Sequence, residues 1–367
     1  ELGSGLEQII EFWKASLSMF RERPLTGMGL ETYSTYFASH RSVEHAVQWE
    51  SLLVDSPHSV PFGILSGGGL VLAATYLASF MVIGYFGVLA VREAKGQLRL
   101  FYGAVLTSWV AYHVQASVSM DVPGLIYAQW ILGGILVAGG ASVSQTVLEL
   151  PWKPRNRRSR RGDGVQGVRR TVAVVGLVIF FVFTIGPLSA PLRANMAVSR
   201  AQAALVVSDP RTAEIELVKA IELQPRYGYY AESMAFLYEQ GGFFEAAFTE
   251  MDRGARLQPG IPYIALKAAR AALAVGRMDA AEYWYERALE ADPNGATAIT
   301  EAAEFYSSEG KSNLASTLME SFESLGSSNT VAWKTAARVY LALGDDAHAE
   351  KAAACYGAGG IPIPDDC

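Results

Sequence analysis

The sequence is poor in cysteine and in charge. It has 367 residues, of which 2 are cysteine, 5 are histidine and 18% are charged. Two cysteines exclude a disulfide-rich scaffold, and Cys355 and Cys367 lack the spacing of zinc ligands. One bridge near the C-terminus and two free thiols both remain open.

The low charge is also unevenly distributed. Hydrophobic residues make up 51% of the chain, which excludes intrinsic disorder and disfavours an ordinary soluble enzyme. Residues 201–367 hold 24 Asp and Glu against 13 Lys and Arg, a net charge of −11. The whole chain carries −6, so residues 1–200 carry +5. We therefore expect a membrane part joined to an acidic, water-exposed part, and no nucleic-acid partner, because the acidic part would repel phosphate.

Four apolar stretches are long enough to cross a bilayer, which takes about 20 residues. They are Leu70–Val91, Phe101–Met120, Leu125–Ala141 and Thr171–Pro187. Because the chain starts at Glu1 without a signal peptide, we expect it to begin mid-protein or after processing. The sequence thus predicts a four-span membrane domain over residues 61–190.

Basic residues in the connecting loops predict the orientation of these spans. The loop after the first span carries Arg92, Lys95 and Arg99, and residues 153–170 carry eight Lys and Arg. The turn at residues 121–124 carries none. By the positive-inside rule both basic loops are cytoplasmic, and the basic run would contact anionic membrane lipid. Residues 1–60 and those after about 190 are then extracytoplasmic, on a multi-pass protein of the cytoplasmic membrane.

A 34-residue repeat runs through residues 201–357. Three sets of residues recur at this spacing: Gly242, Gly276, Gly310 and Gly344; Ala213, Ala247, Ala281, Ala315 and Ala349; and Pro225, Pro259 and Pro293. We expect the glycine to end the first helix of a pair, the alanine to let two helices approach closely, and the proline to stop the second helix. The pattern resembles the tetratricopeptide repeat, whose arrays hold a protein partner on their concave face.

The first sixty residues begin with an apolar pattern typical of an amphipathic helix. Leu6, Ile9, Ile10, Trp13, Leu17 and Phe20 recur every three or four positions, opposite Glu7, Glu11, Lys14 and Arg21. This helix ends at Arg23-Pro24, where residues 24–29, here named the glycine turn, read Pro-Leu-Thr-Gly-Met-Gly.

The order of these pieces resembles a known family. Trp13-Lys14-Ala15, the glycine turn, a polar loop, Asp55-Ser56-Pro57-His58-Ser59 and then a span resemble the large extracytoplasmic loop of the O-antigen ligase and polymerase family. The resemblance covers residues 1–145, and some family members carry a C-terminal tetratricopeptide domain. It implies transfer of a glycan from a polyprenyl-pyrophosphate carrier to an acceptor hydroxyl outside the cytoplasmic membrane, with inversion and without metal or other cofactor.

The resemblance also assigns candidate residues. His58 matches the family histidine, which would take or orient the proton of the acceptor hydroxyl. Arginines would hold the departing pyrophosphate, and the family usually has one shortly before Trp13, where this chain has none. Arg41 or Arg23 could substitute, or the ligands could lie upstream of Glu1. We add Asp55, Ser59, His113 and Asp121 as candidate substrate-binding residues; His113 could equally make a helix-packing hydrogen bond.

The sequence therefore predicts an all-α protein in four parts. These are an extracytoplasmic loop at 1–60, a polytopic membrane domain at 61–190, a tetratricopeptide α-solenoid at 191–357 and a tail at 358–367. The predicted partners are the carrier-linked glycan donor, a glycan or protein acceptor, membrane lipid and a protein on the repeats. Two alternatives remain open: a protein O-oligosaccharyltransferase, and an inactive membrane-anchored repeat scaffold.

Overall fold

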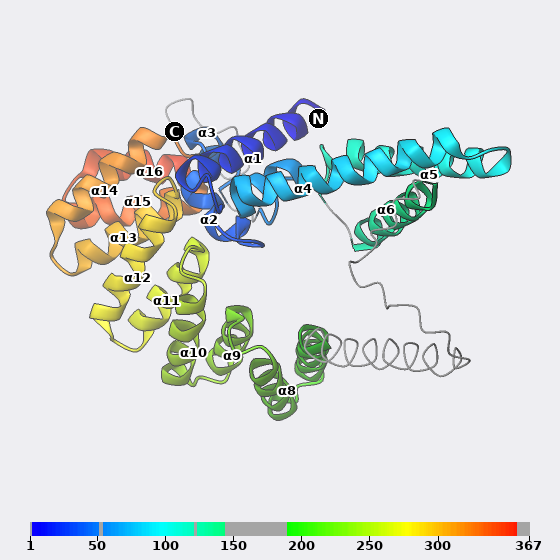
Figure 1. Ribbon diagram of the computed structural model, residues 1–367. Coiled ribbons are helices and arrows are strands. Elements are labelled where there is room, and N and C mark those ends of the chain that lie inside the picture. The colour runs from blue at the N-terminus through cyan, green and yellow to red at the C-terminus, as the bar shows by residue number, and fades with distance from the viewer. Residues whose placement is uncertain (1, 51–53, 121–122, 144–188, 358–367) are drawn as a thin grey trace. The chain divides into compact units, whose positions relative to one another are not determined.

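The computed structural model describes residues 2–50, 54–120, 123–143 and 189–357 (Figure 1). These residues form helices and loops and contain no strand, as the predicted all-α class requires. The chain divides into two compact units, one made of residues 1–146 with 258–367 and the other of residues 147–257. The division falls within the repeat array, so the first two repeat helix pairs and the last three are described separately below.

The first unit opens with α1 (Leu2–Glu22), α2 (Tyr33–His40) and α3 (Val43–Gln48). Their core consists of Phe12, Ala15, Met19, Met28, Tyr33, Phe37 and Val54. The helix predicted over residues 6–20 forms as part of α1, and its most buried residues lie on a face other than that of the apolar pattern. Leu6 is 59% exposed, whereas Phe12 and Met19 on another face are buried. The small residues Ala15 and Ser16 beside them let α1 pack closely on that face.

Three apolar helices follow: α4 (Val60–Glu93), α5 (Gln97–Ala116) and α6 (Pro123–Val143). They pack on one another through Ile83 of α4, Val105 and Trp109 of α5, and Leu136 of α6. Glycines allow the close approach, since a Cβ added to Gly140 would lie 2.3 Å from the backbone oxygen of Phe86. Much of their remaining surface is apolar and exposed.

Within the described residues, one helix is long and apolar enough to cross a membrane by length and composition, namely α4. The apolar stretch Leu125–Ala141 in α6 is shorter than α4. The predicted fourth span, Thr171–Pro187, and the basic run at 153–170 lie outside the described residues. The four-span arrangement therefore stays a prediction.

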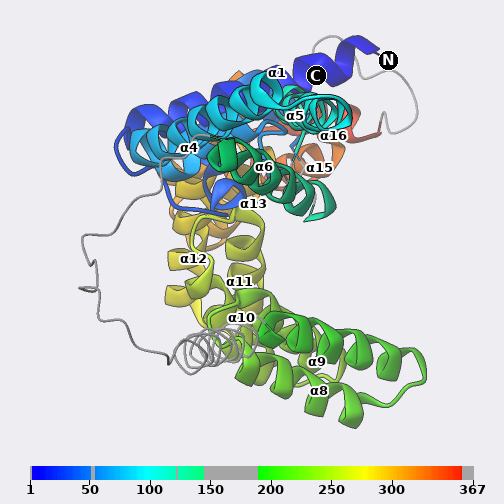
Figure 2. The same ribbon diagram turned by 45° about the vertical axis from the view of Figure 1, so that its right-hand side comes forward.

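The first unit also contains six repeat helices. They are α11 (Pro262–Ala274), α12 (Met278–Ala291), α13 (Ala296–Ser308), α14 (Ser312–Leu325), α15 (Thr330–Leu343) and α16 (Asp346–Gly357). They contact one another as the pairs α11–α12, α13–α14 and α15–α16, which stack in chain order (Figure 2).

The second unit holds the preceding repeat helices. A helix over residues 189–206 is followed by α8 (Pro210–Leu223), α9 (Gly228–Gln240) and α10 (Phe244–Leu257). Its core combines Ala194, Ala201 and Leu217 with Tyr230 and Met234.

The structure confirms the roles expected of the repeat glycines, alanines and prolines. The four repeat glycines follow the first helix of a pair with φ between 70° and 78°, a conformation that glycine adopts at least cost. The five repeat alanines are buried at helix contacts, and the prolines lie directly after α8, α10 and α12. Cys355 in α16 is buried and disulfide-bonded; the other cysteine, Cys367, lies outside the described residues.

Candidate functional site

The glycine turn docks into a break in α4. The helix is interrupted at Gly69, whose φ and ψ are 60° and −158°. Ahead of the break, the Met28 N–H donates to the Ser66 carbonyl at 2.8 Å, and behind it the Leu70 N–H donates to the Pro24 carbonyl at 2.8 Å. The turn therefore pairs backbone groups that an interrupted helix leaves without helical partners.

Glycine is required on both sides of this contact. A Cβ on Gly27 would lie 2.4 Å from the Gly67 carbonyl carbon, and one on Gly69 would lie 2.6 Å from that of Leu25. Both glycines also have positive φ. The backbones meet so closely that no side chain fits between them, and the contact fixes the turn against the start of α4.

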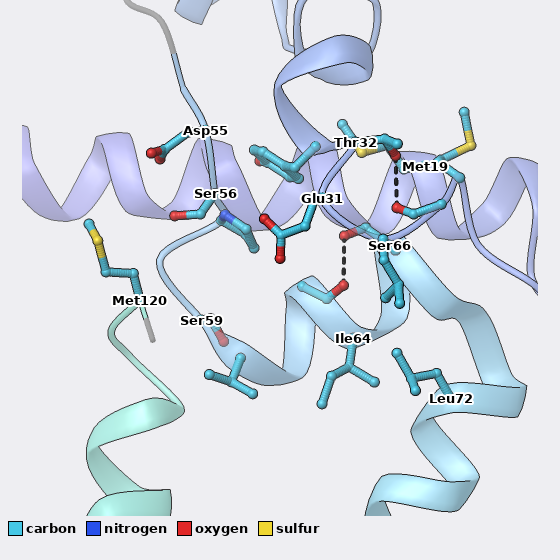
Figure 3. A pocket seen from close by; sticks show the side chains of 18 residues that line it. Met19, Glu31, Thr32, Asp55, Ser56, Ser59, Ile64, Ser66, Leu72 and Met120 are labelled. Carbon is cyan, nitrogen blue, oxygen red and sulfur yellow. Dashed lines mark hydrogen bonds between the residues drawn. The ribbon is translucent and has the colours of Figure 1, made fainter. Parts of the chain in front are cut away.

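A cavity of about 380 Å³ lies beside the docked turn (Figure 3). Its walls come from the glycine turn, the segment that follows it, residues 55–59 and the first turns of α4. The lining residues are Met19, Met28, Gly29, Leu30, Glu31, Thr32, Tyr33, Asp55, Ser56, Pro57, Ser59, Val60, Gly63, Ile64, Ser66, Gly67, Leu72 and Met120. This is the candidate functional site.

Glu31 is a lining residue that the sequence reasoning missed. Its carboxylate points into the cavity (Figure 3), and its φ is 57°, which is uncommon for a residue with a side chain. One signal in the sequence could have indicated Glu31. It lies two residues after the glycine turn, and a carboxylate that close to the turn is placed beside whatever site the turn forms. Asp55 also lines the cavity, as its candidate role requires, and is exposed.

His58 lies at the edge of the cavity. Its two neighbours, Pro57 and Ser59, line the cavity, whereas its own ring packs on Phe12 with the ring centroids 5.6 Å apart. The His58 backbone is left-handed, with φ 52°. Such a conformation costs a non-glycine residue energy and is concentrated at functional sites, so it marks His58 as a residue held in place by its surroundings.

Ser59 and His113 lie at the contact between α4 and α5. The Ser59 hydroxyl donates to the Ser117 carbonyl at 2.8 Å, which joins the cavity wall to the end of α5. His113 is further along α5, where its Nδ1 lies 3.2 Å from the Tyr76 hydroxyl and its ring packs on Trp109. This contact matches the helix-packing interpretation of His113, and the residue does not line the cavity. Asp121 lies outside the described residues.

The two candidate arginines occupy different surroundings. Arg23 precedes the glycine turn, its side chain is more than half exposed, and among the described residues its one ion pair is with Glu22, at 4.0 Å. Arg41 is buried, and its Nη2 donates to Asp292 Oδ2 of α12 at 2.5 Å. Because that guanidinium pairs with a buried carboxylate, and neither residue lines the cavity, the structure does not bring Arg41 into the candidate site.

Arg41 is part of a polar contact between the loop and the repeat helices, here named the clamp. Glu50 contributes two further hydrogen bonds, accepting from the Thr297 N–H at 2.7 Å and from Asn329 Nδ2 at 2.6 Å. Arg41 Nη1 also donates to the Glu50 carbonyl at 3.3 Å. The clamp therefore attaches the loop that bears the cavity to α12, α13 and α15.

His45 is a buried histidine behind the cavity. Its ring packs on Phe12, Phe37 and Trp49, at centroid distances of 5.9, 5.0 and 5.2 Å. Among the described residues, neither ring nitrogen has a hydrogen-bond partner. Burial, reinforced by the nearby Arg41 charge, lowers the pKa of His45 to about 4, so the ring is neutral at physiological pH.

This loop matches a family of known proteins. Residues 9–77 match the O-antigen ligase family model. The matched residues, here named the ligase-like segment, include most of α1, the glycine turn, Glu31, Asp55, His58 and the break in α4. They confirm the family resemblance over this segment. Among curated proteins, no relative of the chain was found.

Solved structures also resemble part of the chain. MamA from Desulfovibrio magneticus RS-1 is 16% identical, with a TM-score of 0.37, over 45% of this chain and 92% of that one. PilF from Pseudomonas aeruginosa is 16% identical, with a TM-score of 0.36, over 49% and 87%. YrrB, described as a TPR protein with an unusual peptide-binding site, is 15% identical, with a TM-score of 0.35, over 44% and 82%. The repeats of this chain are recognised by their own 34-residue period, and these likenesses add nothing on its function.

Proposed function

We propose that this protein transfers a glycan from a polyprenyl-pyrophosphate carrier to an acceptor hydroxyl group on the outer side of the cytoplasmic membrane. The match of residues 9–77 to O-antigen ligases carries the proposal, because that segment holds His58 and most of the cavity walls. Two of the three described non-glycine residues with positive φ, Glu31 and His58, belong to it. That concentration of backbone strain supports a functional role for the segment.

His58 acts as the general base in this proposal. It takes the proton of the acceptor hydroxyl as the new bond forms between the acceptor oxygen and the anomeric carbon. The bond from that carbon to the pyrophosphate oxygen breaks, with inversion, and the pyrophosphate leaves with its carrier. An imidazole suits this step because its ordinary pKa lies near the working pH. The scheme requires no metal and no other cofactor.

Arg23 is the candidate cation for the pyrophosphate. Its side chain is more than half exposed just before the glycine turn, and in the part of the chain that the structure describes its one ion pair is a 4.0 Å contact with Glu22. A free guanidinium can donate two parallel hydrogen bonds to phosphate oxygens. Arg41 takes no part in this proposal, because Asp292 already occupies it.

Exposed apolar side chains support a multi-pass membrane domain. On α4, Tyr85 is 65% exposed, and Leu100 near the start of α5 is 76% exposed. Tyr127 and Ile131 of α6 are likewise exposed. In water such surfaces would drive association, whereas lipid chains cover them at no cost. We therefore propose that all three helices cross the bilayer.

The clamp supports an even number of crossings. Arg41 and Glu50 precede α4, whereas Asp292, Thr297 and Asn329 follow the membrane domain. Groups that bond to each other must lie on the same side of the membrane. If α4, α5 and α6 each cross once, a fourth crossing is needed between α6 and the repeats, and the apolar sequence at 171–187 is suited to it.

The disulfide at Cys355 supports the side proposed for the repeats. Disulfides persist in oxidising compartments and are rare in the cytoplasm. The repeat helices, and with them the clamped loop, are therefore proposed to be extracytoplasmic. There the repeats would bind a protein partner or present the acceptor, as the extended surfaces of such arrays commonly do.

The proposal is tested with the full-length protein in lipid vesicles. A labelled glycan on its polyprenyl-pyrophosphate carrier is supplied with lipid-linked and protein acceptors in parallel, and the product is separated by acceptor. We expect label on a lipid-linked or saccharide acceptor. Label on protein would identify an oligosaccharyltransferase instead.

Transfer to neither acceptor would favour the scaffold alternative. One observation already favours it: within the described residues no arginine or lysine lines the cavity, so the donor's pyrophosphate has no cationic ligand there.

A further inference from the structure

The cavity has a charge pattern that suits one half of the proposed reaction. Its described lining contains two carboxylates, Glu31 and Asp55, and no lysine, arginine or histidine. A pyrophosphate would be repelled by these carboxylates and would find no cation to offset them. Sugar hydroxyl groups, in contrast, are hydrogen-bond donors for which a carboxylate is a strong acceptor.

The polar groups of the cavity are available to a ligand. Within the part of the chain that the structure describes, neither Glu31 nor Asp55 forms a hydrogen bond or ion pair. The Ser56 hydroxyl oxygen is buried and has no hydrogen-bond partner. A buried hydroxyl without a partner is unfavourable, so a ligand that bonds to it would remove that cost.

Much of the rest of the lining is apolar and includes Met19, Ile64 and Leu72 (Figure 3). A pyranose ring complements both parts of this lining. Its apolar C–H faces can pack on the apolar side chains, and the hydroxyl groups at its edges can bond to the carboxylates. A volume of about 380 Å³ lies within the range of pockets for small molecules. A divalent cation is a poorer occupant, since no group of three or more His, Cys, Asp or Glu gathers anywhere in the described residues.

We propose that this cavity is the acceptor subsite, that it binds a neutral saccharide, and that the Glu31 carboxylate selects it by accepting hydrogen bonds from the saccharide hydroxyl groups. The assignment to the acceptor rests on the proposed transferase function. The binding of a neutral saccharide is independent of that function, because it follows from the lining of the cavity alone. The donor's pyrophosphate is then held outside the cavity, at whose edge His58 lies.

Kinetics of the full-length protein test the acceptor assignment. Glu31→Gln keeps the shape of the side chain but removes its charge, and Glu44→Gln changes an exposed carboxylate elsewhere in the loop as a matched control. We expect Glu31→Gln to raise the KM for the acceptor by about tenfold, as the loss of a charge-assisted hydrogen bond does, and to leave the KM for the donor unchanged. A change in the donor KM, or a Glu31→Gln variant that matches Glu44→Gln, would overturn the proposal.

Direct binding separates this inference from the proposed function. Methyl glycosides, inorganic pyrophosphate and Ca²⁺ are titrated into the full-length protein in a detergent without sugar head groups, with binding followed by NMR. Binding of a neutral glycoside that weakens in Glu31→Gln supports the saccharide site even if no transfer is found. Pyrophosphate or Ca²⁺ binding that depends on Glu31, or no glycoside binding, would refute it.

Discussion

Replacing Gly27 with alanine tests the docking of the glycine turn into the broken α4. Its Cβ would lie 2.4 Å from the Gly67 carbonyl carbon and 2.6 Å from the Gly68 nitrogen. Both are backbone atoms, so no side chain can rotate away. Gly96 is the matched control, because its φ of +57° is close to the +66° of Gly27, yet nothing lies within 4 Å of its added Cβ.

The expected magnitudes follow from this comparison. An alanine at either site must adopt a left-handed backbone, which costs about 1–2 kcal/mol. Gly27→Ala must also separate the turn from α4 and so lose the hydrogen bonds from Met28 to Ser66, at 2.8 Å, and from Gly29 to Gly67, at 3.0 Å. At about 1 kcal/mol net for each bond, the variant should lose about 2 kcal/mol more than Gly96→Ala.

The assay is unfolding of the full-length variants by denaturant in one detergent, followed by circular dichroism. Because Gly29, Ser66 and Gly67 line the cavity, Gly27→Ala should also lose transfer activity, whereas Gly96→Ala should keep it. Equal losses of stability in the two variants would refute the close backbone contact described for the turn.

Two further predictions concern groups around the site. Glu50→Ala should lower the free energy of unfolding by about 2 kcal/mol relative to the exposed-site control Glu7→Ala, since it removes two hydrogen bonds to a carboxylate; the same stability in both variants would exclude a contribution from the clamp. His45 should make the free energy of unfolding depend on pH. Its pKa is about 4 in the folded protein and 6.5 in the unfolded chain, so between these values only the unfolded chain binds a proton at His45. The stability present above pH 6.5 is therefore lost as the pH falls toward 4. The loss amounts to about 3 kcal/mol for this shift, and denaturation curves of His45→Leu across that range should lack it; an identical pH dependence in both proteins would contradict a buried neutral ring.

The repeat helices could be predicted from the sequence because their constraints are local. A glycine with positive φ ends the first helix of four pairs, and a proline follows α8, α10 and α12, so the 34-residue period locates most of the pairs. The family match at residues 9–77 likewise agrees with a resemblance visible in the order of short motifs.

Features that depend on distant residues could not be predicted. Arg41 looked available for pyrophosphate because its partner, Asp292, lies 251 positions away in the sequence. On α1, the pattern from Leu6 to Phe20 marks an amphipathic helix, but the residues that enter the core are Phe12 and Met19, which pack with Tyr33 and Phe37. In the sequence, Glu31 is an isolated acidic residue with no motif around it. Only the folded turn directs its carboxylate into the cavity.

The most direct test of the proposed glycosyl transfer is the effect of His58→Asn on its rate. Asparagine tolerates the left-handed backbone found at His58, where φ is 52°, so this variant removes the imidazole without adding strain. His58→Gly, which relieves the strain completely, serves as a second variant with the same loss. If His58 is the general base, both should lower kcat by about a hundredfold or more while the fold and the acceptor KM are kept. Transfer at the wild-type rate by a folded His58→Asn protein would contradict the account.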